Sequence, residues 1–305
     1  MEKPNLAVNV GGISMKNPVM TASGTFGYGQ EFAPLFDLSR LGALVIKGLS
    51  LKPAPGNPPP RTVETCGGML NAVGLENVGL AAFAENKLPF LQSLDVAIIL
   101  NIYGHSIEEY AEMSERIEDF DGIAGIEVNI SCPNIKAGGV AFGTDPKIAF
   151  QVTKAVREKT KLPLIVKLTP NVTDIAIIAR SVEDAGADAV SLINTITAMA
   201  VDVKTRRPKL ANITGGLSGP AIKPIALRMV WNAAQAVRIP VIGVGGIIDA
   251  SDALEFFIVG ARAIQVGTAN FVNPRASVEI VEGLDAYLAE NNISDISQVI
   301  GSLRT

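Results

Sequence analysis

One segment, Glu127-Val-Asn-Ile-Ser-Cys-Pro-Asn134, combines a thiol with two side-chain amides. Its alternating β-branched residues predict a buried strand, which Pro133 must end because proline cannot donate to a β-ladder. We therefore expect Cys132 at the C-terminal end of a strand, where a thiol can act as nucleophile, metal ligand or general base. Asn129 and Asn134 can both donate and accept, as recognition of a planar ligand with ring carbonyl and N–H groups requires. The alternative is a small buried apolar cysteine, the commonest role of a free thiol.

Two lysines also stand at the ends of apolar runs. Lys47 follows Ala-Leu-Val-Ile, and Lys167 follows Leu-Ile-Val. Each needs a carboxylate or an anionic ligand, because an unpaired buried ammonium group is too costly to keep. One such lysine is best explained by an ion pair. Two of them, together with Asn101, Asn129 and Asn194 at other run ends, favour a site for an anionic ligand.

Glycine loops follow the last two apolar runs, in Gly243-Val-Gly-Gly-Ile247 and Val266-Gly-Thr268. Glycine lets backbone N–H groups approach an anion closely, and these are the positions where barrel enzymes commonly hold a phosphate. Ordinary turns are the alternative for a single Gly-Gly pair. Two such loops in the two expected places predict a phosphorylated cofactor whose ring extends toward Lys167 and Cys132.

The chain has a single histidine, His105, which leaves little material for histidine or zinc chemistry. We predict no metal site. A thiolate can serve as the base instead, and a lysine beside a ring cofactor suits a flavin. These residues indicate proton removal by Cys132 and hydride transfer to flavin mononucleotide (FMN). The alternative is a Schiff-base aldolase that uses Lys47 or Lys167, but an aldolase has no need of Cys132 and the amides.

Short apolar runs alternate with stretches of helical period along most of the chain. Residues Ile148, Val152, Ala155 and Val156, and likewise Ile175, Ile178, Ala179 and Val182, have the spacing of one helix face. The eight runs are Val19–Ser23, Leu44–Lys47, Val96–Ile102, Gly125–Ile130, Leu164–Leu168, Ala189–Ile193, Val241–Val244 and Ala263–Val266.

Strand followed by helix, repeated eight times in about 250 residues, predicts a (β/α)8 barrel in the α/β class. A doubly wound sheet is the alternative, but no Gly-x-Gly-x-x-Gly follows the first strand. Leu6–Val10 and Ile13–Met15, on either side of two glycines, predict a hairpin that plugs the barrel floor. With no linker or repeat visible, we expect residues 1–305 to form a single domain.

Three connections are unusually long or glycine-rich. Residues 50–75 contain five prolines after the second strand, and residues 197–220 follow the sixth. Both leave C-terminal strand ends, so they are expected to arch over the catalytic face of the barrel. Residues 136–144, directly beyond Cys132, carry three glycines and are predicted to open and close as a lid.

Composition narrows the class of partner. The 305 residues carry a net charge of −4 and only 5% aromatic side chains, so nucleic acid is not an expected partner. Cys66 and Cys132 form neither a disulfide framework nor a metal-binding spacing, which suits a reducing compartment. Residues 1–12 lack a signal-peptide core, and no run of about 18 apolar residues follows. We expect a soluble, cytoplasmic protein with no membrane contact.

Four motifs together resemble class 1 dihydroorotate dehydrogenase, the flavin enzyme of pyrimidine biosynthesis. They are Asn129-Ile-Ser-Cys-Pro-Asn134, Val166-Lys-Leu-Thr-Pro-Asn171, Gly216-Leu-Ser-Gly219 and Pro240-Val-Ile-Gly-Val-Gly-Gly246. The resemblance runs from about Ala22 to Phe271. It implies that dihydroorotate loses a proton from C5 to Cys132 and a hydride from C6 to N5 of FMN, giving orotate.

The resemblance also implies a role for each matching position. Substrate would be bound by Lys47, Asn71, Ala72, Val73, Gly74, Leu75, Asn129, Asn134, Asn194 and Thr195, with Cys132 as catalytic base. FMN would be held by Ala22, Ser23, Gly24, Lys47, Gly48, Asn101, Asn129, Lys167 and Ile193, and its phosphate by Gly219, Gly245, Gly246, Gly267 and Thr268.

The segment Ile135-Lys-Ala-Gly-Gly-Val-Ala-Phe-Gly143 is most similar to the NAD-linked class 1B catalytic subunit. That class implies a homodimer joined to a second subunit carrying FAD and a [2Fe–2S] cluster, in a heterotetramer that reduces NAD+. The fumarate-using class 1A homodimer is the alternative within the family. Class 2 enzymes differ in having serine at the Cys132 position and a hydrophobic N-terminal extension. Outside the family, a non-catalytic FMN-binding barrel and the pyrimidine-reducing domain of dihydropyrimidine dehydrogenase remain alternatives.

Overall fold

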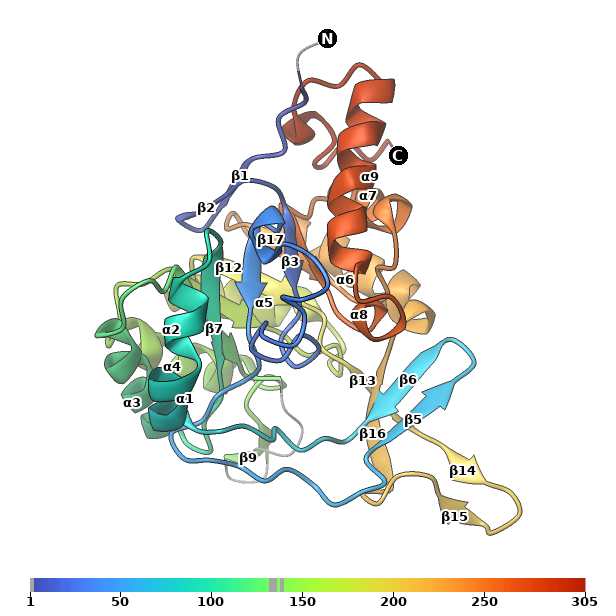
Figure 1. Ribbon diagram of the computed structural model, residues 1–305. Coiled ribbons are helices and arrows are strands. Elements are labelled where there is room, and N and C mark those ends of the chain that lie inside the picture. The colour runs from blue at the N-terminus through green and yellow to red at the C-terminus, as the bar shows by residue number, and fades with distance from the viewer. Residues whose placement is uncertain (1–2, 132–135, 138–139, 305) are drawn as a thin grey trace.

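Eight parallel strands close into a barrel at the centre of the computed structural model, which describes residues 3–131, 136–137 and 140–304 (Figure 1). Each predicted apolar run forms one barrel strand, so the predicted (β/α)8 fold is confirmed. Neighbouring strands follow chain order around the ring. They are β3 (Val19–Thr21), β4 (Ala43–Val45), β7 (Ala97–Ile102), β8 (Gly125–Asn129), β11 (Leu164–Lys167), β12 (Ala189–Leu192), β17 (Val241–Val244) and β18 (Ala263–Val266).

Helices surround this barrel, and several begin at an acidic or hydroxyl cap. Asp145, Asp174 and Asp249 accept hydrogen bonds from first-turn backbone N–H groups, as N-cap residues do. The α-helices are α1 (Leu80–Asn86), α2 (Leu88–Gln92), α3 (Ile107–Glu118), α4 (Pro146–Arg157), α5 (Ile175–Asp184), α6 (Lys223–Ala236), α7 (Ala250–Ile258), α8 (Ala269–Val272) and α9 (Ala276–Glu290), with 3-10 turns η1 (Leu38–Arg40), η2 (Pro220–Ile222) and η3 (Ile296–Gln298).

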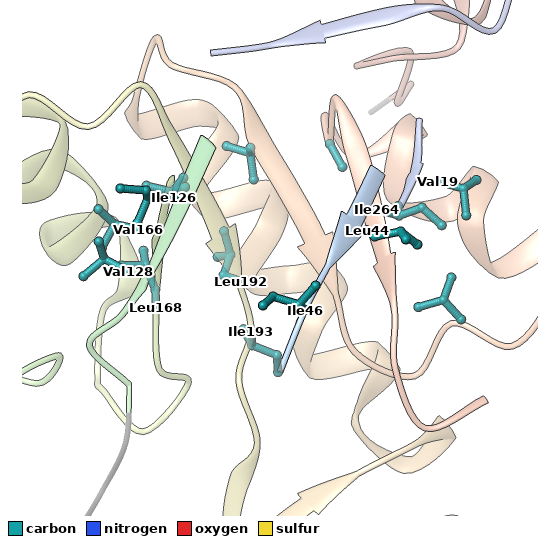
Figure 2. Packing of buried hydrophobic residues seen from close by; sticks show 14 of the residues in the cluster. Val19, Leu44, Ile46, Ile126, Val128, Val166, Leu168, Leu192, Ile193 and Ile264 are labelled. Atoms are coloured by element: carbon teal, nitrogen blue, oxygen red, sulfur yellow. The ribbon is translucent and has the colours of Figure 1, made fainter. Parts of the chain in front are cut away.

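The two-residue period of the strands divides the core into two layers. Side chains such as Val19, Leu44 and Ile126 belong to the layer between strands and helices (Figure 2). The alternate residues, among them Met20 and Ile165, form a second apolar cluster inside the barrel. On β8 this alternation directs Ile126 and Val128 outward, so Glu127 and Asn129 belong to the interior face.

The helix faces follow the predicted period with one correction. On α5 the four predicted residues are all buried. On α4 the buried face consists of Ala149, Val152, Thr153 and Val156, while Ile148 and Ala155 are only partly buried. Thr153 can be buried because its hydroxyl donates to the carbonyl of Ala149 at 2.8 Å, which satisfies its polar group within the helix.

The predicted N-terminal hairpin is present as β1 (Val8–Val10) paired with β2 (Ile13–Met15). Its buried residues Val10, Ile13 and Met15 belong to the apolar cluster inside the barrel. Figure 1 shows it at one end of the barrel. The hairpin therefore closes the floor, and ligands must enter from the opposite end.

Opposite the hairpin, the two long connections combine into one antiparallel sheet (Figure 1). Residues 50–75 supply β5 (Thr62–Thr65) and β6 (Gly68–Asn71), and residues 197–220 supply β16 (Thr214–Ser218), which pairs with β13 (Ile196–Met199). The order is β13-β16-β6-β5. A further ribbon, β14 (Val201–Asp202) with β15 (Arg207–Pro208), extends outward. Long loops over the C-terminal face were predicted, but their pairing with each other was not.

The glycine-rich segment beyond β8 is described only in part. Lys136–Ala137 (β9) pairs antiparallel with Val140–Ala141 (β10). Residues 132–135 and 138–139 lie outside the described residues, so the predicted lid movement stays a prediction. Across the described ranges, no helix is long and apolar enough to cross a membrane.

Candidate active site

One cavity of about 470 Å³ opens at the C-terminal end of the barrel, beneath the β13-β16-β6-β5 sheet. Its volume falls within the range of roughly 300–1,000 Å³ that is usual for small-molecule sites. All site residues predicted from sequence that lie in the described ranges line it. These are Ala22, Ser23, Gly24, Lys47, Gly48, Asn71, Ala72, Val73, Gly74, Leu75, Asn101, Asn129, Lys167, Ile193, Asn194, Thr195, Gly219, Gly245, Gly246, Gly267 and Thr268.

Two predicted residues, Cys132 and Asn134, lie outside the described residues. The chain enters their segment from Ser131, whose hydroxyl accepts a hydrogen bond from Asn194 Nδ2 at 2.5 Å. Ser131 lies two residues after Asn129, a residue of the cavity wall. Their predicted roles, base and substrate amide, stay predictions.

Lys167 ends β11 deep in the barrel and is 5% exposed. Its Nζ lies 3.7 Å from Glu127 Oε2 and donates to Gln265 Oε1 at 3.2 Å. The ammonium group is thus held from below while it lines the cavity. Glu127 offsets part of the cost of burying this charge, and Lys167 can present it to a ligand in the cavity.

Asn101, at the end of β7, leaves one polar atom without a partner. Its Nδ2 donates to Glu127 Oε2 at 2.7 Å, whereas the buried Oδ1 has no hydrogen-bond partner among the described residues. Oδ1 faces Gly48, where an added Cβ would lie 2.8 Å from it. Since Asn101 and Gly48 both line the cavity, this acceptor is available to a ligand N–H group.

Lys47 also lines the cavity, but its electrostatic surroundings differ from those of Lys167. Burial lowers the pKa of its ammonium group, and attraction to Glu76 only partly opposes that effect. No carboxylate in the described ranges lies within ion-pair distance of it, whereas Glu76 is paired with Arg61 at 2.5 Å. The strand β4 ends at Val45, two residues earlier than predicted, and the Lys47 backbone N–H instead donates to Gly27 O. Lys47 is thus a cation suited to an anionic ligand.

Amides at the C-terminal ends of β8 and β12 line the same cavity. Asn129 Oδ1 accepts from Ser131 Oγ at 2.5 Å, and Asn194 Oδ1 accepts from the Thr195 backbone N–H at 2.9 Å. The Tyr110 hydroxyl donates to the Asn129 carbonyl at 2.8 Å and so fixes that backbone. Both asparagine side chains are therefore held in defined orientations before any ligand binds.

Glycines from three loops meet at one side of the cavity. Gly219 and Gly246 have φ values of 97° and 77°, which favour glycine. A Cβ at Gly246 would lie 2.9 Å from Gly219 O, so any larger residue would obstruct the approach of the two loops. Thr268 Oγ1 donates to Ser218 Oγ at 2.8 Å and ties in the third loop. Such a cradle suits a phosphate group.

The sheet over the cavity supplies a roof that is tied to the barrel. Asn71 on β6 pairs with Gly216 on β16, and its Nδ2 donates to the Gly216 carbonyl at 3.5 Å. Asn171, after β11, donates to the Thr195 carbonyl and accepts from the Thr197 N–H. The roof residues are thereby held at fixed positions above the barrel mouth.

Several residues of the site were not predicted. Glu127, Ser191 and Gln265 form a buried polar network beneath the cavity. Each is a polar residue within an apolar run, and this sequence signal could have identified them. The pairing of the roof strands had no such signal, because it joins two loops that are distant in the sequence. Additional lining residues are Thr25, Thr62, Met69, Glu76, Thr197, Asn212, Thr214, Gly215, Gly216, Ser218, Ile222, Val244, Ile247, Ile248, Ala269 and Phe271.

Known proteins resemble this chain over its whole length. The family model described as dihydroorotate dehydrogenase matches residues 5–288. The chain belongs to the dihydroorotate dehydrogenase family. Within the family it is 60% identical, over the full length of both chains, to a protein of Geotalea uraniireducens named dihydroorotate dehydrogenase B (NAD(+)), catalytic subunit. Proteins of the same name from Geobacter metallireducens and Pelobacter propionicus are each 59% identical, with 100% and 99% of each chain covered.

Membership of the dihydroorotate dehydrogenase family implies a flavin, and the cavity has the donors and acceptors that a flavin nucleotide needs. The unpartnered Asn101 Oδ1 offers an acceptor for a ring N–H, and Lys167 offers a cation beside it. The glycine cradle at Gly219 and Gly246 leaves room for a phosphate where side chains would intrude. At Gly24, an added Cβ would meet nothing within 4 Å, so the wall there is open as well.

Proposed function

We propose that this chain is the catalytic subunit of an NAD+-dependent dihydroorotate dehydrogenase, which oxidises dihydroorotate to orotate in pyrimidine biosynthesis. The observation that carries the proposal is that one cavity is lined by two sets of residues. The first set is the glycine cradle, Asn101 and Lys167; the second set is Lys47 with the Asn129 and Asn194 amides. The first set suits FMN and the second suits an anionic pyrimidine. Relatives of full-length coverage are named for this activity.

The residues of the chain divide the work of the reaction. Lys47 binds the substrate carboxylate, and the amides of Asn71, Asn129, Asn134 and Asn194 hold the pyrimidine ring. Cys132 removes the proton from C5 as its thiolate. Bound FMN supplies an acceptor at N5 for the hydride that leaves C6. Gly219, Gly245, Gly246, Gly267 and Thr268 hold the phosphate and so keep the ring in register with the substrate.

The colour of the purified chain tests the proposal directly. A yellow protein with a flavin spectrum is expected, and anaerobic dihydroorotate should bleach it and release orotate. Dihydrouracil should not bleach it, since it lacks the carboxylate that Lys47 binds. Bleaching by dihydrouracil alone would favour a dihydropyrimidine dehydrogenase-like activity, and a bound flavin with no bleaching would favour a non-catalytic barrel. Retention of a sugar phosphate after borohydride treatment would favour the aldolase interpretation.

Orotate affinity is expected to depend on the charge of Lys47. Burial lowers the pKa of its ammonium group, so the proton is lost below the usual pH of about 10.4. The charged form binds the carboxylate; affinity should therefore be constant at lower pH and fall as pH rises through the lowered pKa. Titration of orotate into the holoprotein at several pH values measures this. Lys47→Arg stays charged throughout, so its alkaline decline should disappear. The same decline in both proteins would assign it to another group.

A partner subunit belongs to the same proposal. Relatives are named catalytic subunits, a term that implies a second kind of subunit. We infer a homodimer of this chain bound to a subunit with FAD and a [2Fe–2S] cluster, working in the cytoplasm. Net charge and composition, as described above, suggest no role for nucleic acid.

A further inference from the structure

Glu127 is a fully buried carboxylate inside the barrel, directly below the cavity. Its Oε2 accepts from Asn101 Nδ2 at 2.7 Å and lies 3.7 Å from Lys167 Nζ. Its Oε1 accepts from Ser191 Oγ at 2.7 Å and from Gln265 Nε2 at 2.5 Å. It does not line the cavity, so it cannot touch substrate or cofactor itself. A buried charge with four polar neighbours is costly to assemble, which calls for a role beyond packing.

The carboxylate determines which way its two amide neighbours turn. An ionised carboxylate only accepts, so Asn101 and Gln265 must each direct their NH2 group toward Glu127. Asn101 Oδ1 is consequently left toward Gly48 and the cavity, without a partner in the described ranges. Gln265 Oε1 is left toward Lys167 Nζ at 3.2 Å. The Glu127 carboxylate thus leaves Asn101 Oδ1 free to accept a hydrogen bond and also holds the Lys167 ammonium group in place.

The same carboxylate balances the charge of Lys167. These two side chains are 0% and 6% exposed, so little water screens them. Lys167 lines the cavity and Glu127 does not, which places the positive charge nearer to a ligand. Glu127 therefore lowers the net positive field at the cavity while it holds the lysine in place.

We propose that Glu127 is a positioning residue for the flavin. It orients the Asn101 amide so that its oxygen accepts from the flavin ring, and it holds Lys167 at the ring while limiting how strongly that cation stabilises the charge of the reduced flavin. This inference rests on the proposed function, because it requires FMN in the cavity. Glu127 acts entirely through Asn101, Gln265 and Lys167.

The test is Glu127→Gln, which keeps the size of the side chain and removes its charge. Its new NH2 group must face either Asn101 or Gln265, so one of these amides has to turn and present a donor in place of its acceptor. We expect the dissociation constant of FMN from the apoprotein to rise at least about tenfold, because a buried polar group is left unpaired. The midpoint potential of the bound flavin should rise, because the negative charge that opposes reduction is gone.

Ser191→Ala is the matched control. It removes one hydrogen bond to the same carboxylate at 2.7 Å but leaves both charges, and Ser191 does not line the cavity. Its melting temperature should fall while FMN affinity and midpoint potential stay at wild-type values. The proposal is overturned if Glu127→Gln leaves both quantities unchanged, or if Ser191→Ala shifts them as much.

A second comparison remains informative should Glu127→Gln alone fail to fold. The double variant Glu127→Gln/Lys167→Met removes both charges and leaves no unpaired ion. Lys167→Met alone should lower the midpoint potential of the bound flavin. The double variant should have a higher midpoint potential than Lys167→Met, and equal potentials in these two variants would overturn the proposal. If the wild-type chain binds FMN and oxidises dihydroorotate while the variants keep the wild-type FMN affinity and midpoint potential, only the role of Glu127 is rejected. Wild-type chain that binds no FMN would reject the proposed function together with it.

Discussion

Serine in place of Cys132 is expected to slow flavin reduction by dihydroorotate about 10²–10⁴-fold near neutral pH, the range usual for loss of a general base. A thiolate forms at accessible pH when cations and amides lie nearby, whereas a serine hydroxyl has no adjacent base to take its proton. Binding of FMN and orotate should be little changed, because the substitution replaces one small polar atom. The rate in the serine variant should recover partly as pH rises.

Stopped-flow absorbance of the flavin measures this step apart from later turnover. Cys66→Ser is the matched control, because the other cysteine of the chain is exposed in the turn between β5 and β6 and does not line the cavity. It should reduce at the wild-type rate. Wild-type reduction by Cys132→Ser at pH 7 would remove Cys132 from the role of base.

The second large effect concerns the electron acceptor. The isolated chain is expected to oxidise dihydroorotate with an artificial dye but to reduce NAD+ at no measurable rate. Its sequence contains two cysteines, too few for an iron–sulfur cluster held by four thiolates, and no Gly-x-Gly-x-x-Gly dinucleotide fingerprint. We therefore expect the electrons to leave through a separate protein. Addition of the FAD and [2Fe–2S] subunit should restore NAD+ reduction.

NADH formation at 340 nm, with and without the partner subunit, checks this expectation, and dye reduction by the same sample controls for an inactive preparation. Rapid turnover of the lone chain with fumarate would support the class 1A homodimer instead. Direct reduction of NAD+ by the lone chain would contradict both interpretations.

Local pattern was sufficient for the barrel strands. Each of the eight apolar runs forms a strand because a β-strand buried on both faces is mostly apolar, and turn residues mark its ends. Helix positions were less secure. On α4 the buried face includes Thr153, which a hydrophobic pattern passes over because its hydroxyl is satisfied only once the helix exists.

The sequence by itself determined which residues meet at the cavity, from Lys47 and Lys167 to the glycine loops, because parallel strands of one barrel end on one face. It could not determine the roof, since β6 pairs with β16 across nearly half of the chain. Only the tertiary structure decided which residues Glu127 contacts. Its place in an apolar strand shows that it is buried, but its partners Ser191 and Gln265 come from β12 and β18. Hydrogen bonds across the barrel interior depend on ring closure, which brings distant strands together and leaves no local trace in the sequence.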